Sequence, residues 1–209
     1  MSARDEILAL ATAALGESVV VPEVPRNYRA PGAIALGQDE LVELFTERVA
    51  DYGATIHRSS KGHLHDAVSA IADTAGATRL AAPPGLGVTA NGIDLVLDDP
   101  PLAADALELL DGALTGSAVA VAETGTVILD GGGRSGRRII SLIPDLHICL
   151  VEAATIVANL PDAIARLVAE GRHTSPLTFV SGPSATVDIG FERVQGVHGP
   201  RRVHVVIVQ

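Results

Sequence analysis

Short aliphatic runs, separated by segments with helical spacing, are the feature that most constrains how this 209-residue chain can fold. Such runs occupy residues 79–82, 93–97, 147–151 and 203–208. Strands that are apolar along their whole length are typical of sheets covered on both faces. Their alternation with helices is typical of α/β domains. The sequence therefore predicts an α/β fold around a sheet that is covered on both faces.

Composition limits the kind of core that this fold can have. Hydrophobic residues make up 47% of the chain, but it has three Phe, two Tyr and no Trp, so aliphatic side chains and alanine must fill the interior. The length suits one domain, or one domain with an arm. Apolar periodicity predicts helices over residues 38–52, 65–75, 103–110 and 161–169. Residues 118–129 and 139–143 are expected to be β-strands.

The first 30 residues differ from the rest. Residues 2–15 have the spacing of an amphipathic helix, and the three prolines in residues 22–31 favour an extended connection. We therefore predict an arm over residues 1–30 and an α/β domain over residues 31–209. An amphipathic arm suits docking on a partner protein or on a second copy of the chain, so a homo-oligomer is one alternative.

Several classes of function are disfavoured. A single cysteine, Cys149, permits no internal disulfide framework and no iron–sulfur cluster, and its apolar strand predicts a buried, inert thiol. A net charge of −10 opposes nucleic-acid binding. No apolar run reaches the roughly 18 residues of a membrane span, and the polar start is unlike a signal peptide. The chain is therefore expected to be cytoplasmic.

The histidines do not predict a metal site. His63 and His65 would share one side of an extended segment, but the sequence places no third ligand beside them. A surface position is expected for this pair, and also for His57 and His173.

A glycine-rich segment, residues 131–136, matches the pattern G-x-G-x-x-G. A dinucleotide site requires a helix after this pattern, whereas residues 137–141 are expected to form a strand. Two alternatives stay open: a flexible hairpin loop, or an anion-binding loop in which Arg137 and its neighbours Arg134 and Arg138 hold the ligand.

Three polar, glycine-containing segments adjoin apolar strands: residues 123–126, 181–188 and 196–201. Each by itself is compatible with turn chemistry. Together they are expected to converge at one edge of the sheet, where α/β proteins bind ligands. Glu123 interrupts an apolar run, so its carboxylate must be paired, hydrogen-bonded or catalytic. The candidate ligand-binding residues in the three segments are Thr124, Gly125, Thr126, Ser181, Gly182, Ser184 and His198. Gly125 would allow another backbone or a ligand to approach closely.

These segments also carry a resemblance to a known family. Residues 114–126, 141–147, 181–184 with 188–189, and 196–200 are similar to motifs of the lactate utilization protein C family, the LUD-domain proteins. Residues 25–29 resemble the arm of that family. Gly190 is a departure, since many members have an acidic residue there.

The resemblance implies a fold similar to the sugar-phosphate isomerase and CoA-transferase superfamily: a Rossmann-like, mostly parallel sheet with helices on both faces. It also implies a role in bacterial oxidation of L-lactate to pyruvate, beside two iron–sulfur partner proteins. Because this chain has neither a cluster motif nor a nucleotide fingerprint, we expect an accessory, non-redox component without a cofactor of its own, which binds a small carboxylate. The alternative is an acyl-transfer or phosphosugar enzyme in which Glu123 is the nucleophile or base.

Overall fold

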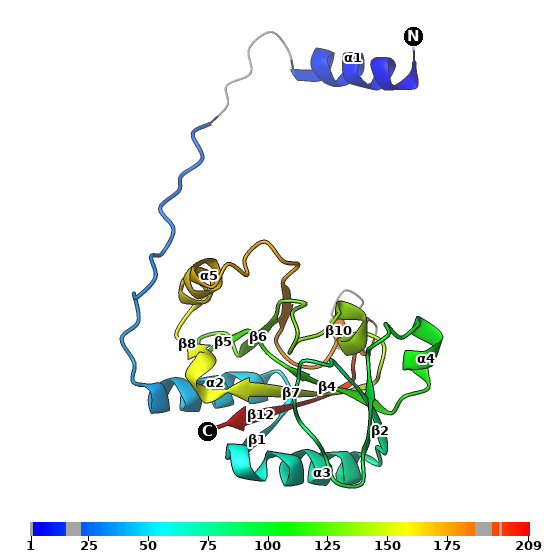
Figure 1. Cartoon of the computed structure of the whole chain (residues 1–209). Helices are drawn as coiled ribbons and strands as arrows, with labels where there is room; N and C mark the ends of the chain where they lie inside the picture. Colours follow the sequence, from blue (N-terminus) through cyan, green and yellow to red (C-terminus); the bar gives the residue numbers. More distant parts are fainter. Residues whose placement is uncertain (1, 16–21, 187–193, 197) are drawn as a thin grey trace.

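The computed structural model describes residues 2–15, 22–186, 194–196 and 198–209, and Figure 1 shows how their elements are arranged. Within these residues, six parallel strands form the main sheet, in the order β1 (Thr55–Ser59), β12 (Arg202–Val208), β7 (Leu146–Glu152), β4 (Gly112–Gly116), β2 (Arg79–Ala82) and β3 (Asp94–Leu97). The predicted α/β fold with a mostly parallel sheet is therefore confirmed.

Side chains of successive strand residues point to opposite faces of the main sheet. On one face, helix α3 (Leu64–Ala75) packs its residues Val68 and Ile71 against Leu114 of β4 and Val206 of β12. The η1 turn (Lys61–His63) precedes this helix, and Gly76 ends it in the left-handed conformation, with φ +69°.

The other face of the main sheet is covered by helix α2 (Gln38–Asp51) and by a second sheet. That sheet contains, among the described residues, the strands β8 (Ile156–Val157), β5 (Val119–Val121), β6 (Thr126–Leu129) and β9 (Thr178–Val180). Phe45 of α2 is fully buried between the two sheets, beside Val127 and Val205. Helix α4 (Ala104–Glu108) packs on the same face, near β2 and β4.

Helix α5 (Leu160–Ala169) covers the outer face of the second sheet, where Leu167 and Ala163 pack on Val119 and Ile128. Asn159 caps this helix by accepting a hydrogen bond from the Asp162 backbone N–H, and a proline occupies its first turn. The η3 turn (Ala153–Thr155) leads into β8, and the short pair β10 (Ala185–Thr186) and β11 (Val194–Gln195) precedes β12.

The arm begins with helix α1 (Ala3–Leu15), which has no buried residue and lies apart from the sheets in Figure 1. The extended residues 22–36 then approach the body. Arg29 forms two hydrogen bonds with the Glu123 carboxylate, and the Gly32 N–H donates to the Asp162 carboxylate. Arg29 thus attaches the arm to the β5–β6 turn, and Gly32, just after the arm, contacts α5.

The prediction of a strand over residues 139–143 is wrong. The chain there forms the short 3-10 helix η2 (Arg138–Ser141), in which the Ile140 N–H donates to the Arg137 carbonyl. Ile140 is fully buried against Leu107 and Ala113. Hydrophobicity alone does not distinguish the sequence of a short buried helix from that of a strand. Here the packing against α4 favours the helical turn.

The expected surface position of His57 is also wrong. Its ring is half-buried and stacks on His204, with ring centroids 5.3 Å apart and 3.0 Å between His57 Nε2 and His204 Nδ1. Burial lowers the pKa of both rings. The parallel pairing of β1 with β12 brings the two histidines together, and no local pattern indicates that pairing.

Candidate functional site

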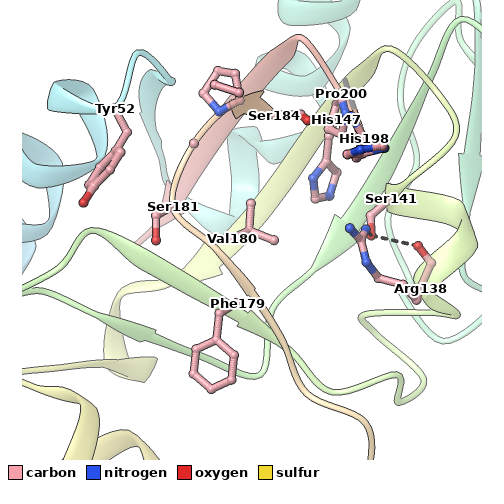
Figure 2. A pocket seen from close by; sticks show the side chains of 14 residues that line it. Tyr52, Arg138, Ser141, His147, Phe179, Val180, Ser181, Ser184, His198 and Pro200 are labelled. Carbon is pink, nitrogen blue, oxygen red and sulfur yellow. Dashed lines mark hydrogen bonds between the residues drawn. The ribbon is translucent and has the colours of Figure 1, made fainter. Parts of the chain in front are cut away.

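A hollow of about 390 Å³ opens where β7 and β12 begin, between the main sheet and the strand β9 (Figure 2). Its polar side chains come from five segments: the end of α2, η2, the start of β7, the chain after β9 and the loop before β12. They are Tyr52, Arg138, Ser141, His147, Ser181, Ser184 and His198. Two of the three polar segments predicted from the sequence therefore meet here. They meet at the amino ends of parallel strands, whereas α/β folds generally bind ligands at the carboxyl ends.

Hydrogen bonds hold the two loops of the hollow together. The Ser184 N–H donates to the Pro200 carbonyl at 2.9 Å, and the His198 N–H donates to Ser184 Oγ at 3.1 Å. Gly182 adopts φ +111°, and a Cβ atom there would lie 2.7 Å from Tyr52 Cβ. The predicted residues Ser181, Gly182, Ser184 and His198 thus form one wall of the hollow.

The third predicted segment lies beside the hollow rather than in it. Thr126 Oγ1 is 2.8 Å from Ser181 Oγ and 2.7 Å from Thr124 Oγ1, so a chain of hydroxyls connects the β5–β6 turn to the wall. Gly125 adopts φ +56°, and a Cβ there would lie 2.6 Å from backbone atoms of Arg48 and Val49. The prediction that another backbone approaches Gly125 closely is confirmed.

Glu123 belongs to this turn and does not line the hollow. Arg29 of the arm engages both of its oxygens, and these hydrogen bonds hold the pKa of the Glu123 carboxyl below its usual range. The carboxylate is therefore paired, which is one of the outcomes expected for it.

The glycine-rich loop does not connect two strands of a hairpin: it joins β6 to η2. Arg137, predicted to bind a ligand, instead forms two hydrogen bonds with the buried carboxylate of Asp98, at 2.6 and 2.7 Å. Arg138, the next residue, lines the hollow. Arg137 and Arg138 have different surroundings because the 3-10 turn points adjacent side chains in different directions.

Arg138 has a guanidinium group that forms no ion pair with any described residue. Its Nη1 donates to Ser141 Oγ at 3.1 Å, and that hydroxyl donates to the Arg138 carbonyl. Partial burial lowers the pKa of Arg138, but a guanidinium stays charged at neutral pH. The hollow therefore contains a fixed positive charge.

The sequence reasoning missed three polar residues that line the hollow, Tyr52, Ser141 and His147, of which His147 is the most deeply buried. Its side chain is 1% exposed, and its Nε2 lies 2.8 Å from the hydroxyl of the fully buried Thr115 on β4. Burial, assisted by the nearby charge of Arg138, lowers the pKa of His147 to about 4, so the ring is neutral at pH 7. The signal that singled out Glu123, a polar residue inside an apolar run, is present at His147 as well.

Cys149 is buried two residues further along β7, and burial raises the pKa of its thiol to about 12. The predicted burial of this thiol is confirmed. Among the described residues, no group of three or more His, Cys, Asp or Glu side chains is arranged to hold a metal ion. Asp188, Ile189 and Gly190 lie outside the described residues.

Comparisons with known proteins agree with this architecture, a parallel α/β sheet with a second sheet on one face. The family model described as "LUD domain" matches residues 42–208. A lactate utilization protein C from Deinococcus radiodurans is 41% identical over 189 residues, which cover 90% of this chain and 87% of that protein. Another, from Shouchella clausii, is 29% identical over 199 residues, covering 87% and 86%.

A solved structure also resembles this chain. It is the crystal structure of a DUF162 family protein from Deinococcus radiodurans, with a TM-score of 0.72 and 36% identity, and it matches 84% of this chain and 100% of that one. The chain belongs to the LUD-domain family, among the lactate utilization protein C proteins. No helix in the described part of the chain is both long and apolar enough to cross a membrane.

Proposed function

We propose that this chain is an accessory, non-redox component of a bacterial system that oxidises L-lactate to pyruvate, and that it binds a small organic acid in the hollow. The names of its relatives, lactate utilization protein C, support the pathway. The one cysteine supports a non-redox role, since an iron–sulfur cluster typically needs about four thiolates. The clusters are then expected on partner proteins.

Arg138 is the observation that carries the ligand proposal. Arg137, Arg172 and Arg201 each pair with a carboxylate of the chain, at Asp98, Asp130 and Asp145 respectively. Arg138 has no such partner among the described residues and lies in a hollow that also offers hydroxyl groups. A carboxylate ligand would supply the counter-charge, and a guanidinium can bind it with two parallel hydrogen bonds.

Binding can be measured by titration calorimetry of the full chain with lactate and with pyruvate at pH 7.5. Arg138→Gln is expected to weaken acid binding at least about tenfold, because a charge-assisted pair contributes about 1.5–3 kcal/mol. Arg134→Gln is the matched control, since Arg134 interacts with Glu152 outside the hollow. The ligand proposal is refuted if no binding heat is measured at millimolar acid, or if both variants lose the same amount of affinity for the acid.

The partner proposal needs a separate test. The full chain is purified with its native partners, and the iron and acid-labile sulfide of the complex are measured. A complex that carries clusters is expected, and deletion of residues 1–30 is expected to dissociate it while the α/β domain stays folded. Purification of the chain without any iron–sulfur protein contradicts the partner proposal.

A further inference from the structure

The hollow is larger than a three-carbon acid. Its volume is about 390 Å³. The six non-hydrogen atoms of lactate take up roughly 180 Å³, even if each occupies as much space as a water molecule in the liquid. An acid of this size bound at Arg138 therefore leaves more than half of the hollow to solvent, and the hollow has room for a longer ligand.

A second hollow, of about 330 Å³, adjoins the first. Arg138 and Ser141 of η2 belong to the walls of both. The opposite wall also continues from one hollow to the other, because three of the residues 175–178 line the second hollow and residues 179–185 line the first. Figure 2 shows Arg138 and Ser141 facing Val180 across the first hollow. The two hollows are therefore parts of one groove between η2 and the chain around β9.

Arg138 provides the unpaired charge of this groove. Its guanidinium forms no ion pair with a described residue. The other charged residues that line the second hollow are already paired: Arg137 with Asp98, and Asp130 with Arg172. A second charge on the ligand would find no counter-charge among the described residues of this hollow, and burying an unpaired charge is costly. The part of a ligand that extends beyond Arg138 is therefore expected to be uncharged.

The wall of the second hollow suits a hydrocarbon chain. Leu129 and Pro176 contribute apolar side chains, and Gly131 and Gly136 contribute backbone without a side chain. A hydrocarbon chain that enters this hollow leaves water, and each methylene group that is fully buried raises the affinity up to about fourfold. The second hollow can therefore strengthen the binding of an acid whose carboxylate lies at Arg138.

We propose that the groove binds a linear carboxylic acid longer than lactate, with the carboxylate at Arg138 in the first hollow and an uncharged, largely hydrocarbon chain in the second. This inference deepens the proposed function and rests on it, because it takes Arg138 to be the group that binds the carboxylate. It adds the second hollow as the part of the site that selects the length of the acid.

The first test compares propionate, hexanoate and hexan-1-ol by titration calorimetry of the full chain at pH 7.5. Hexanoate is expected to bind at least about tenfold more tightly than propionate, because three further methylene groups are buried. Hexan-1-ol lacks the carboxylate and is expected to bind at least about tenfold more weakly than hexanoate. Equal affinities for the two acids, or for hexanoate and the alcohol, overturn the inference but leave acid binding intact. Heat from neither acid removes the proposed ligand, and this inference with it.

The second test blocks the second hollow. Ser175→Trp places a large ring there and is expected to abolish most of the gain in affinity from propionate to hexanoate, while the affinity for propionate stays unchanged. Ser175→Leu, a smaller change, is expected to remove part of the gain. His173→Trp is the matched control, since His173 is exposed in the same loop and lines neither hollow. A full gain in both Ser175 variants, or the same loss in His173→Trp, overturns the proposal.

Discussion

The buried neutral state of His147 makes the stability of this protein depend on pH. Its pKa is about 4 in the folded chain, below the ordinary value of 6.5 that applies when the chain is unfolded. Between these two values the unfolded chain binds the proton and the folded chain does not. The free energy of unfolding therefore falls as the pH drops from about 6.5 towards 4, and this contribution is constant above pH 7.

The size of this contribution follows from the difference between the two pKa values. Each pKa unit corresponds to about 1.4 kcal/mol. Between pH 7.5 and pH 4.5, proton uptake by His147 in the unfolded chain should remove about 2–3 kcal/mol of stability. That is a large fraction of the 5–15 kcal/mol that holds a typical domain together.

The assay is urea unfolding followed by circular dichroism at pH 7.5 and pH 4.5. Wild-type protein is compared with His147→Gln, in which the amide can still bond Thr115. Between pH 7.5 and pH 4.5, the free energy of unfolding should fall by about 2–3 kcal/mol less in the variant than in the wild type. This difference isolates His147, because His57, His204 and the carboxylates titrate in both proteins. His173→Gln, in an exposed loop, should behave as the wild type does. Equal losses in the wild type and in His147→Gln would refute the reasoning.

Three further predictions concern the segments around the site. Gly125→Ala should lower the free energy of unfolding by at least about 2 kcal/mol, because the left-handed backbone and the contact with α2 both oppose a side chain; a change below 0.5 kcal/mol in urea unfolding would contradict the close approach. Asp98→Asn should cost about 1–3 kcal/mol, since it leaves the hydrogen bonds of Arg137 weakened at a buried position; an unchanged unfolding midpoint would disprove this. Glu123→Gln should change stability by less than about 1 kcal/mol, as its ion pair with Arg29 is exposed, yet speed proteolysis of the arm. Cleavage at the wild-type rate would show that this pair does not hold the arm.

Much of the fold follows from local pattern. Aliphatic runs located β2, β3, β7 and β12, and helical spacing located α2, α3 and α5. These features depend on residues close together in sequence, so they can be predicted without tertiary contacts. Two segments were exceptions. Residues 139–143 have few apolar residues, which suit either a strand or a helical turn, and β4 (Gly112–Gly116) was not predicted as a strand.

The site could be predicted only in part. Ser181, Ser184 and His198 were identified because small polar residues and glycine interrupt the sequence beside apolar strands, and the structure brings them to one hollow. Arg137 was chosen from a loop of three arginines, of which Arg138 is the one that lines the hollow. Neighbouring arginines look alike in sequence, and only the position of the Asp98 carboxylate distinguishes them.

The sequence by itself determined the class of this protein: an aliphatic α/β domain with the motifs of the LUD-domain family. Only the tertiary structure decided that the hollow lies at the amino ends of β7 and β12, and that His147 faces it. The reason is that burial and strand order are properties of the assembled sheets. A histidine inside an apolar run becomes a neutral hydrogen-bonding group when β4 places Thr115 beside it and the second sheet removes the water.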